Sequence, residues 1–121
     1  MKFYYNNELI RTSKNHEYTH AVINVETGGC KGCRTSAQAC ESIISSEIKH
    51  HKDYIANLEK KINAIKSGKP YYYETFHGRD YRIPIKQSDT AEEAQERIES
   101  LKESMEYIRK NWQIVELERR G

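Results

Sequence analysis

The sequence predicts a single α+β domain over residues 1–121, in which an N-terminal antiparallel β meander precedes two long helices separated by a β hairpin. Three observations predict this fold: short β-favouring runs fill residues 2–34, two heptad patterns follow, and an aromatic-rich segment with turn residues lies between those patterns. The expected boundaries are residues 1–35 for the meander, 36–67 for the first helix, 68–88 for the hairpin and 89–118 for the second helix.

The expected meander has four strands, at Lys2–Tyr5, Glu8–Thr12, Glu17–Val25 and Cys30–Arg34. Turn residues separate them at 6–7, 13–16 and 27–29. In the third run, alternate residues share a face, and the face of Thr19, Ala21, Ile23 and Val25 is the more apolar one. We therefore expect that face to meet the core.

The first helix is expected to begin at Thr35 or Ser36 and to stop before Gly68 and Pro70. Asp89 and Glu92 have capping-box spacing and predict the start of the second helix, which is expected to run to about Leu117. Apolar residues in both helices recur at alternating spacings of three and four, as in a coiled coil. The two seams are Ile44, Ile48, His51, Ile55, Leu58, Ile62 and Ile65, and Ala91, Ala94, Ile98, Leu101, Met105, Ile108, Trp112 and Val115.

These seams are narrow, so a pair of helices covers only one stripe on each. The apolar share of the chain is 36%, which leaves a 121-residue monomer a small core. We expect helices of two or more copies to form an oligomeric bundle; the alternative is a monomer whose sheet packs on the helix pair.

Composition excludes several classes of protein. The net charge of +2 is too small to argue by itself for duplex DNA or an anionic membrane. No apolar run is long enough to span a bilayer, and no secretory signal is evident, so a cytosolic location is expected. No nucleophile signature, phosphate-binding glycine loop or isolated carboxylate pair is present. We therefore expect no enzymatic activity and no cofactor.

Three cysteines are an odd number, and we expect reduced thiols. Cys30 and Cys33 have the spacing of a zinc knuckle or a redox pair, but a hairpin with a small buried thiol explains them as well. His51 on the seam is expected to be a polar core position that fixes helix register. The sequence thus predicts no metal site.

The hairpin combines aromatic and basic residues, a mixture suited to stacking on bases and clamping phosphates. By alternation, half of the rings pack on the helices and half are exposed; tyrosines that only replace aliphatic core are the alternative. The candidate ligand-binding residues here are Tyr72, Phe76, Arg79 and Arg82.

Arg109 follows a seam position near the C-terminal end of the second helix, beside Asn111. In an oligomer it is expected to meet the hairpin or Arg34 of another subunit. The helix dipole is a sufficient structural reason for Lys110, Arg119 and Arg120. Arg109, Arg34 and Asn111 therefore join the candidate ligand-binding residues.

A β meander followed by a helix pair, with arginines and rings near the seam, resembles the small phage anti-defence proteins. In particular, it resembles the anti-Thoeris sponges, which sequester cyclic ADP-ribose-type immune signals without cleaving them. The resemblance covers length, element order and composition over most of the chain, and the stretches LIRTSKNHEYTHAVIN and GCRTSAQACESI are similar to the openings of small phage proteins. It implies base stacking on an aromatic ring, arginine contacts to a pyrophosphate, with Arg109 as the helix-borne arginine, and further contacts at Asn57 and Glu92.

Three functions stay open. The first is a non-enzymatic phage protein that sequesters a cyclic nucleotide signal in the host cytosol, of the cyclic ADP-ribose type or a cyclic oligonucleotide, and self-associates. The second is an anti-CRISPR-like inhibitor of a host defence protein. The third is a nucleic-acid-binding accessory protein that uses residues 71–82, which the small net charge disfavours.

Overall fold

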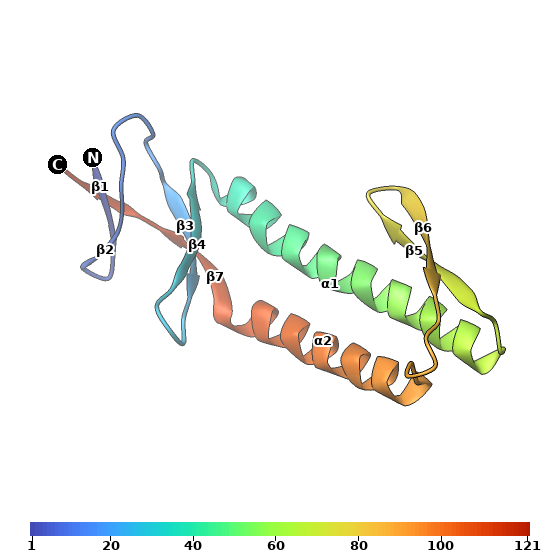
Figure 1. Ribbon diagram of the computed structural model, residues 1–121. Helices are drawn as coiled ribbons and strands as arrows, with labels where there is room; N and C mark the ends of the chain where they lie inside the picture. Colours follow the sequence, from blue (N-terminus) through green and yellow to red (C-terminus); the bar gives the residue numbers. More distant parts are fainter. The chain divides into compact units, whose positions relative to one another are not determined.

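The computed structural model describes all 121 residues and has the α+β class that the sequence predicts. Two helices and three small antiparallel sheets make up the chain (Figure 1). The chain divides into two compact units: residues 1–47 with 106–121, which we call the sheet unit, and residues 48–105, which we call the hairpin unit. Neither helix combines the length and the apolar content needed to cross a lipid bilayer.

Two three-stranded sheets form most of the sheet unit. The first has the order β2 (Glu8–Thr12), β1 (Lys2–Tyr5), β8 (Glu118–Arg120), and the second the order β4 (Cys30–Arg34), β3 (His20–Asn24), β7 (Trp112–Glu116). The predicted strands at 2–5, 8–12 and 30–34 are confirmed, and the third begins three residues later than expected. A single four-stranded meander is wrong, because β2 and β3 do not pair and the chain's last residues supply a third strand to each sheet.

The core of the sheet unit is small and includes a thiol. Ala21, Ile23 and Cys33 are buried together, with side chains of both sheets packed against them. Both faces of β3 are covered, since Val22 and Asn24 are buried as well as Ala21 and Ile23. The prediction of one apolar inner face therefore holds for Ala21 and Ile23 and is wrong for Thr19 and Val25, which are exposed on either side of β3.

The first helix, α1 (Ala37–Lys66), has the bounds that the sequence predicts within one residue. The side chain of Ser36 accepts a hydrogen bond from the amide of Ala39, so Ser36 is the N-cap. Gly68 has a φ of 67°, and the amides of Gly68 and Lys69 bond back to the carbonyls of Ile65 and Ala64. Gly68 is therefore a left-handed cap, and the predicted end of the helix before it is confirmed.

The second helix, α2 (Ala91–Asn111), is shorter than predicted. Its N-cap is Thr90, whose hydroxyl accepts from the amide of Glu93, and not Asp89. The prediction of helix to residue 118 is wrong, because the helix ends at Asn111 and the strands β7 and β8 follow it. Trp112 and Val115 continue the seam spacing, but their run is rich in β-branched and aromatic residues, and pairing with β3 supplies partners that a helix would lack.

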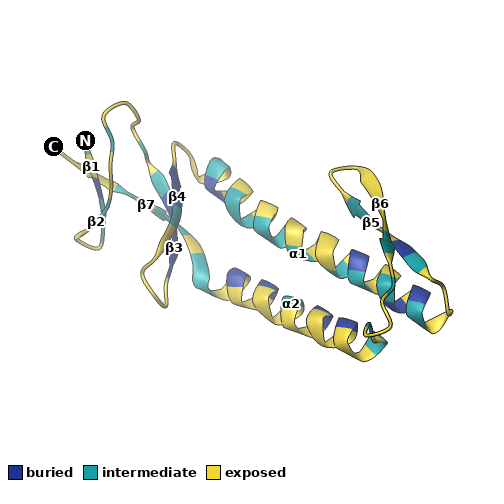
Figure 2. Ribbon diagram, in the orientation of Figure 1, coloured by how far each residue is buried: buried dark blue, intermediate teal, exposed yellow.

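In the hairpin unit, the parts of α1 and α2 that it contains pack on each other through Ile62, Ala94 and Ile98. Partly buried Ile55, Leu58 and Ala91 flank this cluster, and all six lie on the predicted seams. Buried or half-buried positions recur along α2 at intervals of three or four residues, while the positions between them are exposed (Figure 2). The two helices therefore pair within one chain over this region.

Candidate ligand-binding surface on the hairpin

The predicted hairpin is β5 (Tyr71–Phe76) paired with β6 (Arg79–Pro84). The two-residue turn at His77 and Gly78 has φ values of 51° and 74°. Positive φ at both positions matches the twist of the strands, and glycine adopts it without a Cβ penalty. Pro84 ends β6, as expected for a residue that cannot donate to a ladder.

Alternation divides the hairpin into two faces. Because Tyr73 lies opposite Arg82 and Phe76 lies opposite Arg79, the members of each cross-strand pair share a face. One face, which we call the tyrosine face, carries Tyr71, Tyr73, Thr75, Asp80 and Arg82. The opposite face carries Tyr72, Glu74, Phe76, Arg79, Tyr81 and Ile83.

Tyr72 belongs to the interior of the hairpin unit. Its side chain is only 7% exposed, and its hydroxyl donates a hydrogen bond to the carboxylate of Glu74. Burial and this acceptor raise the pKa of Tyr72 above its ordinary value, so the phenol stays protonated. A ring held in this way supports the fold and offers little surface to a ligand.

Asn57 fastens the hairpin to α1. Its amide nitrogen donates to the carbonyl oxygen of Thr75 over 3.2 Å, and its side-chain oxygen accepts from the amide of Thr75 over 2.9 Å. With 5% of its surface exposed, Asn57 has both ends of its side chain occupied. The structure therefore gives Asn57 a positioning part, holding β5 against the helix.

Aromatic and cationic groups meet on the tyrosine face. The guanidinium carbon of Arg82 lies 4.0 Å from the ring centre of Tyr71, and the rings of Tyr71 and Tyr73 contact edge to face with centres 5.7 Å apart. Tyr73 is 48% exposed. A guanidinium stacked on a ring and a half-exposed second ring form a surface on which a flat, electron-rich group can stack.

A hollow of about 720 Å³ opens beside this cluster. Tyr71, Tyr72 and Tyr73 line it from β5, and Lys60 and Lys69 bring ammonium groups to it. Its one carboxylate, Asp80, accepts a hydrogen bond of 2.6 Å from the hydroxyl of Thr75. Neither lysine forms an ion pair, and two lysines against one carboxylate give the hollow a net positive charge beside its rings.

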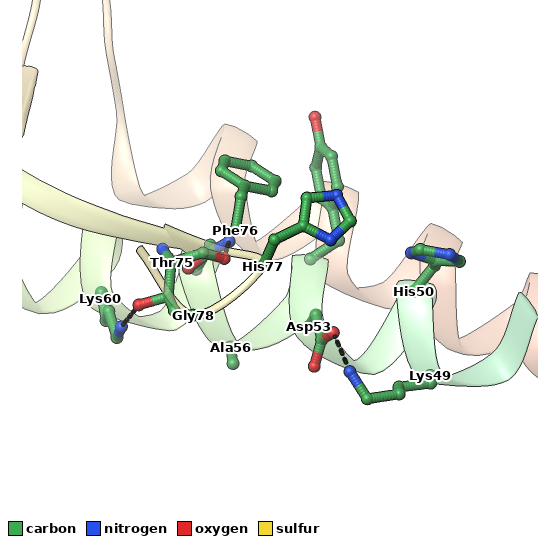
Figure 3. A pocket seen from close by; sticks show the side chains of 11 residues that line it. Lys49, His50, Asp53, Ala56, Lys60, Thr75, Phe76, His77 and Gly78 are labelled. Atoms are coloured by element: carbon green, nitrogen blue, oxygen red, sulfur yellow. Dashed lines mark hydrogen bonds and ion pairs between the residues drawn. The ribbon is translucent and has the colours of Figure 1, made fainter. Parts of the chain in front are cut away.

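A second hollow of about 340 Å³ is lined by the turn of the hairpin and by α1 (Figure 3). Phe76 and His77 contribute rings from the hairpin, and His50 contributes one from the helix (Figure 3). Lys60 lines this hollow too, and its ammonium donates to the hydroxyl of Thr75 over 3.0 Å. The carboxylate here, Asp53, is paired with Lys49 at 3.0 Å.

The other predicted site residues lie apart from these hollows. Arg79 is exposed on the opposite face of the hairpin from Arg82 and lines neither hollow. Arg109, Arg34 and Asn111 belong to the sheet unit, where Arg34 donates to the carbonyl oxygen of Cys33 over 2.8 Å. Arg109 is exposed at the end of α2 and forms no ion pair. Of the predicted set, Phe76 and Asn57 line the smaller hollow and Tyr72 lines the larger one.

The residues that sequence reasoning left out are Lys60, Lys69, Tyr71 and Tyr73. Alternation separated Tyr71 and Tyr73 from Tyr72 and Phe76 correctly, but it does not say which face of a hairpin turns toward a helix. Lys60 lies one helical turn after Asn57, so the two share a side of α1. That spacing was the available signal for Lys60.

The cysteines form no disulfide, and Cys33 and Cys40 are buried. Desolvation, together with the neighbouring Cys30, raises the pKa of Cys33 to about 11, so it is a neutral thiol near pH 7. No three side chains among the histidines, cysteines and carboxylates converge on a point where a metal ion could be held.

Arg119 and Arg120 were expected at a helix C-terminus, and this is wrong because both lie in β8. They pair instead with Glu17 and Glu118, at 2.9 and 3.0 Å. The hydrogen bond and the charge of the adjacent Arg120 guanidinium lower the pKa of the Glu118 carboxyl.

Comparisons of this chain with protein-family models, with curated proteins and with solved structures found no match. The structure defines the class as α+β, with the antiparallel sheets and the two helices described above. The geometry of the hairpin unit therefore carries the argument on function.

Proposed function

We propose that this protein is a non-catalytic binding protein that captures a nucleotide on the tyrosine face of its hairpin. The observation that carries the proposal is the Arg82 guanidinium stacked on Tyr71 at 4.0 Å, beside the half-exposed ring of Tyr73 and a hollow lined by Lys60 and Lys69. A nucleobase stacks on such rings, and ammonium and guanidinium groups hold its phosphates.

The resemblance to anti-Thoeris sponges supports a narrower form of the proposal. In this form the protein is a phage anti-defence protein that acts in the host cytosol and holds a cyclic nucleotide signal, of the cyclic ADP-ribose type or a cyclic oligonucleotide, without cleaving it. Side chains that stack and neutralise charge are sufficient for sequestration, since no bond has to be broken. Self-association through the helices belongs to the same proposal, and size-exclusion chromatography with light scattering tests it by giving the mass in solution.

Calorimetric titration of the full chain with AMP and with cyclic ADP-ribose isomers tests the proposal. Tyr73→Ala is expected to weaken binding by about 1–3 kcal/mol, because one stacking face is lost. Arg82→Ala is expected to weaken it by about 1.5–3 kcal/mol, through loss of a charged donor. Recovery of the nucleotide unchanged after incubation, by chromatography, is the expected result for a protein that does not cleave it.

The hairpin offers a matched control for each variant. Tyr81 is 47% exposed, like Tyr73, but lies on the opposite face, and Arg79 stands in the same relation to Arg82. Tyr81→Ala and Arg79→Ala should leave the affinity within about twofold, a change of roughly 0.4 kcal/mol. Absence of any heat or thermal shift with all of these nucleotides would contradict the proposal, as would equal losses on both faces.

A second candidate function, inhibition of a host protein in the manner of an anti-CRISPR, is favoured by the opposite face. Phe76 and Tyr81 are both exposed there, with ring centres 6.3 Å apart. Exposed aromatic side chains are typical anchors of protein interfaces. If this function holds, Phe76→Ala and Tyr81→Ala abolish co-purification of a stoichiometric host protein, while Tyr73→Ala does not.

A further inference from the structure

The two hollows of the hairpin unit share one side chain. Lys60 lines both of them, and its ammonium donates to Thr75 on β5 over 3.0 Å. Thr75 in turn donates to Asp80 over 2.6 Å, which fixes the hydroxyl that holds Lys60 in place. Because Lys60 forms no ion pair, its charge is available to an anion that reaches either hollow.

Each hollow has aromatic groups of its own. Tyr71 and Tyr73 line the larger hollow, and Phe76 and His77 line the smaller one. Tyr73 and Phe76 lie on opposite faces of the hairpin and three residues apart on β5, and a rise of about 3.3 Å per residue separates their backbones by about 10 Å. Two nucleobases joined by one phosphodiester can be splayed apart over such a distance, with the phosphate between them.

The charges around both hollows fit a phosphate at Lys60. The larger hollow is lined by one carboxylate, Asp80, against two lysines, and the carboxylate that lines the smaller hollow, Asp53, is paired with Lys49. Lys69 lines the larger hollow and His50 and His77 the smaller one, so each side holds a further nitrogen group that can donate to a phosphate oxygen. Anionic groups are thus favoured along the line from one hollow to the other.

We propose that the ligand of the hairpin unit carries two nucleobases joined through phosphate, one ring in each hollow and the linking phosphate on Lys60. This inference rests on the proposed function and narrows its ligand class. A mononucleotide fills only one hollow, whereas a dinucleotide gains the second stacking contact at little further entropic cost, as for any linked pair of groups.

Calorimetric titration of the full chain compares three probes: AMP, the linear dinucleotide ApA and cyclic di-AMP. At least one of the two dinucleotides is expected to bind at least about tenfold more tightly than AMP, since the link brings the second base to its hollow. A preference for ApA identifies an open-chain ligand, and a preference for cyclic di-AMP a cyclic one. Equal affinities for AMP and both dinucleotides would overturn the inference.

Two variants measure separately what Lys60 and what the smaller hollow contribute to dinucleotide affinity. Phe76→Ala is expected to lower dinucleotide affinity by about fivefold or more and to leave AMP affinity unchanged, because AMP prefers the tyrosine face. Lys60→Ala should lower dinucleotide affinity at least about tenfold, the usual loss for a charged donor. Lys52→Ala removes an exposed lysine of the same helix that lines neither hollow, and it should have no effect. A dinucleotide affinity insensitive to Phe76→Ala would also overturn the inference.

Failure of this inference is distinguishable from failure of the proposed function. If AMP binds in a way that depends on Tyr73 and neither dinucleotide binds more tightly, the proposed function stands and the two-base ligand is wrong. If no nucleotide binds, both are wrong. A tetranucleotide included as a fourth probe detects single-stranded nucleic acid: affinity that continues to rise with length, with a steep salt dependence, contradicts a two-base ligand.

Discussion

The sheet unit and the hairpin unit each bury one polar residue, and the two residues are both asparagines. In the sheet unit, Asn24 is 3% exposed; it accepts hydrogen bonds from the amides of Glu26 and Thr27 and donates to the hydroxyl of Tyr107. In the hairpin unit, the side-chain nitrogen and oxygen of Asn57 both form hydrogen bonds with the backbone of Thr75. A buried amide thus closes a turn in one unit and fastens a hairpin in the other.

The units differ further in the partners of some of their lysine and arginine side chains. In the sheet unit, Lys31 pairs with Glu47 and stacks on Trp112, and both C-terminal arginines have carboxylate partners. In the hairpin unit, Lys60, Lys69 and Arg82 have none and lie around hollows or on rings. Other lysines of the hairpin unit are paired, Lys49 with Asp53 and Lys61 with Asp89, so the cations that remain available for binding are those around the hollows.

The largest loss of stability is expected when a core side chain of the sheet unit is truncated. Phe3 is fully buried, and its ring contacts Tyr18 edge to face with centres 5.5 Å apart. Phe3→Ala is expected to lower the free energy of unfolding by about 3–5 kcal/mol, as transfer and cavity costs add. Urea unfolding followed by the fluorescence of Trp112, which lies in the same unit, measures it.

Leu9→Ala is the control for Phe3→Ala. Leu9 is a large exposed side chain of the adjacent strand, and its loss should cost less than about 0.5 kcal/mol. Similar losses in both variants would mean that the β1–β2–β8 sheet does not bury Phe3.

Much of the element order could be predicted, because turn residues and caps act locally. Gly68 ends α1 where expected, and the hairpin follows from His77 and Gly78. The strands at 112–120 could not, because Trp112 and Val115 fit a helical seam and the pairing of β7 with β3 is set by residues some ninety positions away along the chain. The sequence predicted a site with aromatic and basic residues on the hairpin, but not which of these residues line the hollows. The face of the hairpin that meets α1 depends on the hydrogen bond between Asn57 and Thr75.

The next largest loss of stability is expected when either of the two buried asparagines is replaced, and the two variants can be compared directly. Asn57→Ala is expected to cost about 2–3 kcal/mol, because the amide and carbonyl of Thr75 lose their partners. Asn24→Ala should cost a similar amount. Hydrogen exchange separates them: the first variant is expected to speed exchange at Thr75 and along β5, and the second at Glu26 and Thr27.

Asn63→Ala is the control for that pair, since Asn63 is exposed on the same helix as Asn57. It should leave exchange at Thr75 unchanged. If Asn57→Ala also leaves it unchanged, the hairpin is held by other contacts, and the geometry of the larger hollow does not depend on this amide.

The smallest effect concerns acid stability in the hairpin unit. Asp89 accepts from the amide of Lys86 over 2.7 Å and pairs with Lys61 at 3.2 Å, and these contacts lower its pKa below the ordinary value. A carboxyl with a lowered pKa in the folded state stabilises fully above about pH 4, and this stabilisation is lost as the pH falls through the lowered pKa. Because the pair is partly exposed, about 0.5–1 kcal/mol is expected.

Urea unfolding at a series of pH values between about 2 and 6 measures this loss, and Asp89→Asn should flatten it, because an amide oxygen still accepts from Lys86 but no longer titrates. Asp53→Asn provides the comparison within the same unit, since its ion pair with Lys49 is more exposed and should contribute less than about 0.5 kcal/mol. An equal flattening of the pH dependence by both substitutions would mean that the hydrogen bond from the Lys86 amide adds nothing to the stabilisation that comes from the charge of Asp89. Asp89 would then stabilise the protein no more than an exposed surface carboxylate does.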